Sequence, residues 1–227
     1  MFLRFKESNI PLKVGILGTG VVGNTIGSKL VQLGHEVKMG SRTASNEKAV
    51  QWAKNNGPKA SNGTFADAAS FGELVFNCTA GMASLEALRQ AGSKNLKGKI
   101  LVDLANPLDF SKGMPPTLSV ANTDSLAEQI QRAYPETKVV KTLNTMSSTV
   151  MTNPKVVSGD HDVFVSGNDP ESKAKVVDLL KKGFGWKSVV DLGDITSARG
   201  TEMLLPVWVR LYGLYQSPNF NFRIVRQ

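Results

Sequence analysis

The sequence predicts a doubly wound α/β fold, in which helices cover both faces of a mostly parallel sheet and a small helical extension follows at the C-terminal end. Short apolar runs typical of buried strands alternate with segments of helical character along the 227 residues. A glycine-rich turn joins the first of these runs to the first helical segment. We expect a tail at 1–12, one Rossmann domain at 13–194 and the extension at 195–227.

The glycine-rich turn reads Gly18-Thr19-Gly20-Val21-Val22-Gly23. It follows the apolar run 13–17 and opens an amphipathic segment that ends at Gly34, which is the setting of a dinucleotide fingerprint. Gly18 permits the tight turn, Gly20 lets the backbone approach a pyrophosphate, and Gly23 lets the helix pack on the strands. The pyrophosphate would bind the free N–H groups at the positive end of the helix dipole. The alternative is an ordinary turn whose glycines serve packing alone.

The residues after the second predicted strand, 35–40, indicate which dinucleotide binds. NAD enzymes usually place Asp or Glu about 20 residues past the first glycine to bind the ribose 2′-hydroxyl, whereas this chain has Ser41, Arg42 and Thr43. Hydroxyl donors and a guanidinium group suit a 2′-phosphate, and Lys48 adds a more distant positive charge if a helix begins near residue 45 or 46. We therefore predict NADP(H) rather than NAD(H). A solvated Arg42 with no ligand is the alternative.

Further apolar runs predict strands at 74–78, 100–103, 139–143, 163–166 and 188–191. Since open α/β sheets bind ligands at the carboxyl ends of their strands, residues that follow three of these runs should converge on the cofactor crevice. They are Cys78, Thr79, Ala80, Gly81, Asn106, Pro107, Asn144 and Met146. Small residues at 79–81 allow close approach to the ribose and nicotinamide, and each asparagine offers a donor and an acceptor. Either asparagine is equally explained as a turn residue.

Composition favours a cytoplasmic protein that binds neither a membrane nor nucleic acid. No apolar run approaches the ~20 residues that span a bilayer, and the first residues lack the core of a signal peptide. The net charge is +8, but the lysines are scattered rather than gathered into a basic run with interleaved aromatic residues. The single cysteine, Cys78, excludes an internal disulfide framework, and its apolar run indicates a buried strand residue rather than a nucleophile.

No metal site is expected. His35 begins a strand and His161 lies in a turn, and neither has a ligand-type neighbour at helical spacing. Both histidines are therefore interpreted as structural or solvated.

The C-terminal region predicts a cover over a second ligand. Residues 196–212 read as one helix with an internal kink at Pro206. Its apolar residues are too widely spread for one buried stripe: they are Met203, Leu204, Leu205, Val207, Trp208, Leu211 and Tyr212. We expect the sheet on one side and either a flat ring or a partner subunit on the other, with Trp208 and Tyr212 at a homodimer interface. Apolar and polar residues alternate over 220–225, which is typical of a final strand or a dimer-swapped arm.

Five motifs together carry a resemblance: residues 13–20, 40–42, 102–107, 141–146, and 191–206 with Arg199, Glu202 and Pro206. In this combination the chain, from Lys13 to about Arg226, resembles the NADPH-dependent oxidoreductases of the deazaflavin coenzyme F420 family. It also resembles the cytosolic reductase domain of the six-transmembrane metalloreductases. The resemblance implies hydride exchange between NADP(H) and a flavin-like acceptor. It places the 2′-phosphate on residues 41–43 and the other phosphates on residues 19–22.

The chain departs from the family pattern where the acceptor would bind. It has Asn144 and Met146 where the family has a His and an Ile, and the segment 108–123 is longer. The cofactor prediction is unaffected, but the acceptor stays open between F420, flavin mononucleotide and free flavins.

Direct hydride transfer from the nicotinamide needs no acid–base triad, so no catalytic side chain is expected. The protein would supply proximity, orientation and exclusion of water. We expect the acceptor to bind between the strand ends near Asn144 and Met146 and a lid made by Met203, Leu204 and Pro206. The alternative function is an NADP(H)-binding sensor without turnover. A β-hydroxyacid or imine dehydrogenase is disfavoured because such enzymes generally add a long helical domain.

Overall fold

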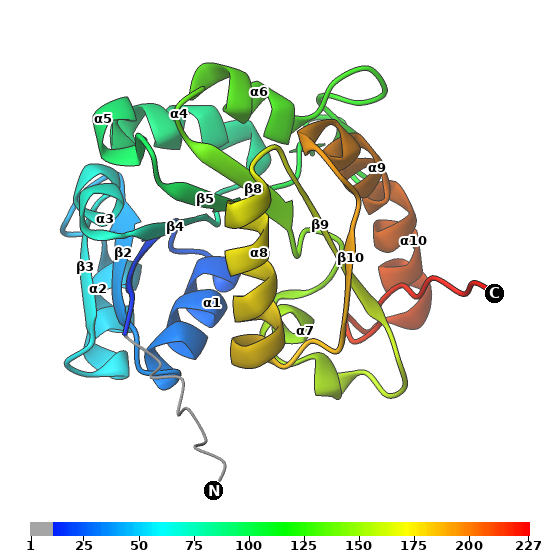
Figure 1. Cartoon of the computed structure of the whole chain (residues 1–227), viewed down its shortest axis with the longest axis horizontal. Helices are drawn as coiled ribbons and strands as arrows, with labels where there is room; N and C mark the ends of the chain where they lie inside the picture. Colours follow the sequence, from blue (N-terminus) through cyan, green and yellow to red (C-terminus); the bar gives the residue numbers. More distant parts are fainter. Residues whose placement is uncertain (1–10) are drawn as a thin grey trace, which may run out of the picture.

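An eight-stranded sheet forms the centre of the computed structural model, which describes residues 11–227 (Figure 1). The strand order is β10-β9-β8-β5-β4-β1-β2-β3. The strands are β1 (Lys13–Leu17), β2 (Glu36–Ser41), β3 (Ala60–Thr64), β4 (Leu74–Asn77), β5 (Ile100–Asp103), β8 (Lys138–Thr142), β9 (Asp162–Gly167) and β10 (Ser188–Asp191). The β8–β9 pair is antiparallel and the other six pairs in this sheet are parallel. The predicted fold class is therefore confirmed.

Helices cover both faces of the sheet, and two apolar clusters fill the layers between them (Figure 1). One face carries α1 (Val21–Gln32), α2 (Glu47–Asn56), α7 (Ser148–Thr152) and α8 (Pro170–Asp178). The other carries α3 (Phe65–Phe71), α4 (Gly81–Ala91), α5 (Ser93–Leu96), α6 (Leu126–Ala133) and α9 (Ala198–Met203). Short helical turns lie at Pro154–Val156, Leu179–Phe184 and Ile195–Ser197. Ligands of such a sheet bind at its carboxyl edge.

The strands predicted from apolar runs are present within one residue of the predicted ends, and 100–103 and 188–191 match at both ends. Strand β3 was not predicted because its sequence, Ala-Ser-Asn-Gly-Thr, is polar and lies at the sheet edge, where one side needs no apolar cover. The segment 108–123 contains a small hairpin, β6 (Leu108–Asp109) with β7 (Thr117–Leu118), that was not predicted either.

The predicted single helix over 196–212 is wrong. The chain forms α9 and then a separate helix, α10 (Leu205–Tyr215), with Leu204 between them. Pro206 lies in the first turn of α10 rather than at an internal kink. Proline is tolerated there because the first N–H groups of a helix have no intrahelical partner.

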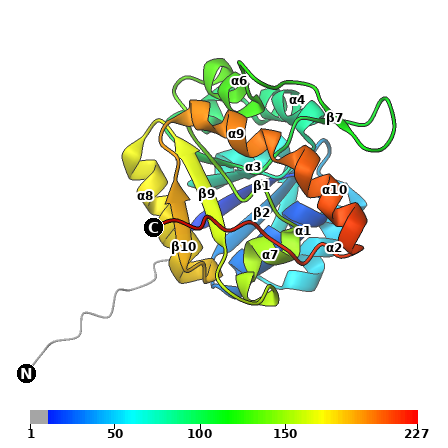
Figure 2. The same cartoon turned by 90° about the vertical axis from the view of Figure 1, so that its right-hand side faces the viewer.

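The predicted final strand over 220–225 is also wrong, because these residues have no regular secondary structure. They run back from α10 across β9 of the same chain, as Figure 2 shows in dark red. The backbone N–H of Asp162 donates to the carbonyl of Phe222 (2.9 Å), and the N–H of Ile224 donates to the Asp162 carboxylate (2.6 Å). Isolated bonds to His161 and to the backbone and side chain of Asp162 therefore hold the segment, where a ladder of backbone bonds was expected.

Within residues 11–227, no helix has the length and apolar character needed to cross a bilayer. The division into a tail, a Rossmann domain and an extension stays a prediction, and residues 1–10 of the tail lie outside the described residues.

Candidate functional site

The turn between β1 and α1 has the geometry of a phosphate cradle. Gly18 has a φ of +118°, and a Cβ there would lie 2.7 Å from the carbonyl oxygen of Cys78. A Cβ on Gly23 would collide with the Gly18 carbonyl oxygen. At Gly20, by contrast, no atom of the described residues lies within 4 Å of an added Cβ. Gly18 and Gly23 thus permit close packing, while Gly20 leaves open space at the start of α1.

The N-terminus of α1 is suited to an anion. Gly20 is the N-cap, no side chain of the described residues caps the helix, and its first turn carries no acidic residue. The first N–H groups therefore keep their hydrogen-bonding capacity and the positive end of the helix dipole is not neutralised. Thr19 and Val22 are half-buried beside this position, and Val21 is exposed.

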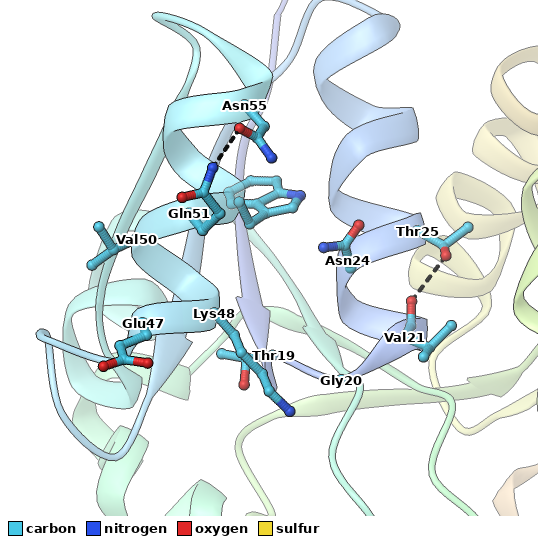
Figure 3. A pocket seen from close by; sticks show the side chains of 11 residues that line it. Thr19, Gly20, Val21, Asn24, Thr25, Glu47, Lys48, Val50, Gln51 and Asn55 are labelled. Carbon is cyan, nitrogen blue, oxygen red and sulfur yellow. Dashed lines mark hydrogen bonds between the residues drawn. The ribbon is translucent and has the colours of Figure 1, made fainter.

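A groove of about 990 Å³ extends from this turn between α1 and α2 (Figure 3). Its lining residues are Thr19, Gly20, Val21, Asn24, Thr25, Glu47, Lys48, Val50, Gln51, Trp52 and Asn55. The Lys48 side chain points toward Thr19 and Gly20, whereas Glu47 points away (Figure 3). As predicted, α2 begins beside Asn46, whose side chain accepts the N–H of Ala49 (3.1 Å). This arrangement directs one positive charge toward the phosphate cradle.

The loop after β2 exposes a cation at the carboxyl end of that strand. Arg42 and Thr43 are exposed, whereas Ser41 is buried and its hydroxyl donates to the carbonyl of Thr43 (2.6 Å). Hydrogen bonds from Arg89 and Gln90, helped by the charges of Arg89 and Arg42, lower the pKa of Glu86 on α4 to about 2. Arg42 is thus an exposed cation directly after β2, whereas the Ser41 hydroxyl already donates its hydrogen within the loop.

The ends of β5 and β8 are joined by a pair of asparagines. Asn106 Nδ2 donates to the carbonyl of Asn144 (2.8 Å), and Asn144 Nδ2 donates to Asn106 Oδ1 (2.9 Å). Leu143, just before Asn144, has a φ of +62°, in the left-handed region that leucine rarely adopts. A Cβ on Gly81 would collide with the Asn106 carbonyl, so the start of α4 lies against the same loop. The predicted convergence of the strand ends is present.

Other predicted site residues are less accessible. Cys78 is buried, and this burial raises the pKa of its thiol, as expected for a strand residue rather than a nucleophile. Pro107 is buried, Thr79 is half-buried and Ala80 is exposed. Met146 is 5% exposed and packs in the apolar cluster on the α1 face. The backbone of 78–81 and 106–107 is therefore better placed than the side chains to face a ligand.

The predicted lid residues lie at the junction of α9 and α10. Met203 and Pro206 are exposed and Leu204 is half-buried. The preceding residue, Glu202, is fully buried and forms an ion pair with Lys141 on β8 (2.9 Å). The structure therefore ties the lid to the strand that ends beside Asn144.

Sequence reasoning missed a buried charged cluster beneath these strand ends. Lys141 also forms an ion pair with Asp103 at the end of β5 (2.8 Å) and donates to the carbonyl of Ala105. Burial lowers the pKa of Lys141, but the two carboxylates outweigh burial and raise it overall, so the ammonium stays charged. A signal was present, because a lysine inside a buried apolar strand requires a partner.

Both histidines have structural contacts. His161 is buried, bonds to the carbonyl of Pro154 (2.9 Å) and lies edge-on to Trp186. His35 Nδ1 accepts the N–H of Leu12 (3.1 Å), and burial lowers its pKa. No group of three or more His, Cys, Asp or Glu side chains within residues 11–227 is arranged to hold a metal.

Comparison with known proteins shows which family the chain resembles. The family model described as NADP oxidoreductase, coenzyme F420-dependent, matches residues 13–107. The F420-dependent NADP reductase of Methanocaldococcus jannaschii is 30% identical over 225 residues, covering 94% of this chain and 98% of the relative. The chain belongs to this family. The predicted resemblance is confirmed, and the family assignment identifies an NADP(H)-dependent oxidoreductase.

Three other proteins show how far the likeness extends. An Arthrobacter sp. FB24 crystal structure, assigned as an F420-dependent NADP reductase, has 55% identity and a TM-score of 0.90, covering 95% of this chain and 100% of that one. Rat metalloreductase STEAP3 is 30% identical over 205 residues, 86% of this chain but only 38% of the relative's length. An imine reductase of Myxococcus stipitatus in complex with NADP⁺ shares the fold, at 19% identity and a TM-score of 0.63, over 90% of this chain and 64% of that one.

The open space at Gly20 leads to a test of the cradle. We expect Gly20→Val to abolish NADPH binding in calorimetry, because the branched side chain occupies the space where the pyrophosphate must lie. The fold should persist, since an added Cβ has no neighbour within 4 Å among the described residues other than its own chain neighbours, and the residue has an extended conformation.

Gly200→Val in α9 is the matched control, because a Cβ there also has no neighbour within 4 Å among residues 11–227. It should leave the affinity for NADPH unchanged. Unaltered binding by Gly20→Val would mean that the turn is a packing device.

Proposed function

We propose that this protein transfers a hydride between NADP(H) and coenzyme F420. The main support for this proposal is the carboxyl edge of the sheet. An uncapped α1 N-terminus, an arginine after β2 and the linked ends of β5 and β8 all lie at this edge, in a chain that belongs to the F420-dependent family. The end-to-end match to an F420-dependent NADP reductase supports F420 as the acceptor. Flavin mononucleotide and free flavins are the alternative acceptors, since Asn144 and Met146 depart from the family pattern.

We assign roles to the residues of this edge as follows. The backbone of residues 19–22 binds the pyrophosphate, and Arg42, Thr43 and Lys48 bind the 2′-phosphate. Ser41 shapes the loop that carries Arg42 and Thr43, because its hydroxyl donates to the carbonyl of Thr43, and it binds the phosphate only when that hydroxyl turns away from this partner. The segments 78–81 and 106–107 face the ribose and nicotinamide. Asn144, Met146, Met203, Leu204 and Pro206 border the acceptor.

The cofactor supplies a transferable hydride, so the side chains contribute position rather than proton transfer. The Asn106–Asn144 pair holds the ends of β5 and β8 in register, which fixes the floor on which the rings meet. A donor and an acceptor must approach to about 3–3.5 Å with their rings facing. The apolar residues Met203 and Leu204 suit a cover that excludes water from that contact.

Stopped-flow oxidation of NADPH tests the function directly. With F420 in excess we expect rapid single-turnover loss of the reduced nicotinamide absorbance, and slower loss with flavin mononucleotide or riboflavin. If NADPH is not oxidised with any of these acceptors, the result would favour the alternative, a module that binds NADP(H) without turnover. Faster reaction with a flavin would identify a flavin reductase.

The same assay tests the lid. Met203→Ala should lower the single-turnover rate by about 10-fold, because a looser cover misplaces the acceptor, while the dissociation constant for NADPH stays unchanged. Phe110→Ala, an exposed apolar truncation on the 108–123 segment, is the control. If Phe110→Ala slows transfer and Met203→Ala does not, the acceptor binds along 108–123.

Arg42 is expected to determine the preference for NADPH. Arg42→Ala removes a charge-assisted contact of about 1.5–3 kcal/mol, which is about 10- to 150-fold in affinity. Binding of NADH should be nearly unchanged, because it lacks the 2′-phosphate. Titration of both nucleotides by fluorescence measures the two constants, and equal losses would contradict the assignment.

We also infer a cytoplasmic homodimer in which α10 forms the interface. Its outward residues Val207, Tyr212, Leu214 and Tyr215 are exposed, and Leu214 is 72% exposed. Trp208 stacks on Tyr212 (5.6 Å between ring centroids) and on Phe220 (5.3 Å), so this apolar face is already ordered. Ordered aromatic side chains are typical of interfaces. A single, buried cysteine fits a reducing compartment.

Sedimentation velocity tests the dimer. Leu214→Asp should shift the protein from dimer to monomer, because it buries an unpaired charge in the interface. Phe110→Asp, an equally drastic change at another exposed apolar residue, should leave the mass unchanged. A wild-type monomer would rule out the proposal.

A further inference from the structure

Lys141 joins three separate parts of the molecule through one buried ammonium group. Its side chain is 1% exposed, and its three N–H donors match three acceptors: Asp103 Oδ2, Glu202 Oε1 and the carbonyl of Ala105. Asp103 ends β5, Ala105 follows that strand, and Glu202 belongs to α9. The residue therefore links the strand ends of the crevice to the helix that carries the lid.

The Asp103 side of this link continues to the end of β4. Asp103 Oδ1 accepts Asn77 Nδ2 (2.8 Å) and the N–H of Ala105 (3.3 Å). Asn77 Oδ1 in turn accepts the hydroxyl of Thr79 (2.6 Å). Ser84 on α4 bonds to both Asn77 and Thr79. We call this chain of contacts the Asp103 arm, and it ends at the segments assigned to the nicotinamide side.

The Glu202 side leads to α6 and the lid. Glu202 Oε2 accepts the N–H of Leu126 (2.8 Å), and Oε1 accepts the N–H of Ala127 (3.1 Å) as well as Lys141. A carboxylate at a helix N-terminus is favoured by the free N–H groups and the dipole. Because Met203 is the next residue, this second chain of contacts, the Glu202 arm, fixes the start of the lid.

Stability alone gives a poor account of this cluster. Desolvation of buried ion pairs offsets most of their attraction, and apolar residues of similar volume are often as stable. Buried charges do, however, demand specific geometry, because each must keep its partners. The cluster lies at the ends of β5 and β8, where the proposed function requires two rings to be positioned with an error of only a fraction of an ångström.

We propose that Lys141 is a positioning residue with two separable arms: the Asp103 arm sets the nicotinamide side of the crevice, and the Glu202 arm sets the lid on the acceptor side. The roles of the two sides rest on the function proposed above. Lys141 itself touches neither substrate and transfers no proton.

Two variants separate the arms. Glu202→Gln keeps the shape and an acceptor oxygen but weakens the link to α9, so it should raise the KM for the acceptor and lower the hydride-transfer rate by about 10- to 100-fold. Its dissociation constant for NADPH should stay within about twofold of wild type. Asp103→Asn should have the opposite effect. It should lower the affinity for NADPH by about 10-fold and change the KM for the acceptor less.

Two control variants remove comparable contacts elsewhere. Arg199→Met breaks the ion pair between α9 and Glu128 on α6 without touching Lys141. Lys99→Met breaks bonds to the carbonyls of Ala69 and Ser70 at the other end of β5. Both should lower the melting temperature and leave the two binding parameters unchanged. If either control shifts the acceptor KM as much as Glu202→Gln does, the effect is general loosening and the proposal fails.

Hydrogen–deuterium exchange gives a readout that does not depend on turnover. Glu202→Gln should speed exchange in 198–204 but not in 78–81, and Asp103→Asn should speed exchange in 78–81 but not in 198–204. Equal changes in both segments, or in neither, would overturn the two-arm proposal. Failure of the wild type to oxidise NADPH with any acceptor would instead contradict the proposed function, with the exchange pattern still deciding the arms.

Gentler variants cover the case in which a charge change prevents folding. Ser84→Ala loosens the Asp103 arm without altering any buried charge, and Glu202→Asp shortens the Glu202 arm while keeping its charge. We expect the same segment-specific exchange, with smaller amplitude. Exchange that is unaltered in both variants would also overturn the proposal.

Discussion

The demand that buried charges keep their partners governs the carboxyl edge of this sheet. Lys141, Asp103 and Glu202 are nearly inaccessible to water, so each is stable only in the arrangement in which the other two are present. That arrangement requires β5 and β8 to be adjacent and α9 to pack over their ends. Misplacing any of these elements would leave an unpaired charge in a dry interior, which makes the geometry of the crevice part of the fold.

The phosphate end of the crevice depends on a different constraint, the backbone. Gly18 and Gly23 allow α1 to begin close to β1 and β4, and Gly20 leaves the approach to its first N–H groups open. Because these requirements are local and concern residues without side chains, the sequence predicts them well. The start of α2 beside Asn46 is equally local, since the capping side chain and the N–H that it accepts are only three residues apart.

Features that depend on distant contacts could not be predicted in the same way. Lys141 lies 38 residues from Asp103 and 61 from Glu202, so an apolar run with one lysine gives no hint of which partner it finds. The edge strand β3 has no apolar pattern to detect. The residues 220–225 alternate like a strand although they make only isolated bonds, to His161 and Asp162. Pro206 was assigned to a helix interior because the apolar residues continue without interruption across Leu204, and only the backbone shows that the helix ends there and a second one begins.

The two ends of the crevice are thus held by different means, and the difference suits hydride transfer. The nucleotide binds through many contacts spread along a rigid backbone, so its position tolerates small errors at any one of them. The contact between the two rings tolerates almost no positional error, since the rate of hydride transfer falls steeply with distance. A short helix such as α9, with exposed Met203 at its end, has little apolar burial to hold it still. Anchoring it through Glu202 to the ammonium that also fixes β5 and β8 places the cover and the floor of the crevice on one rigid group.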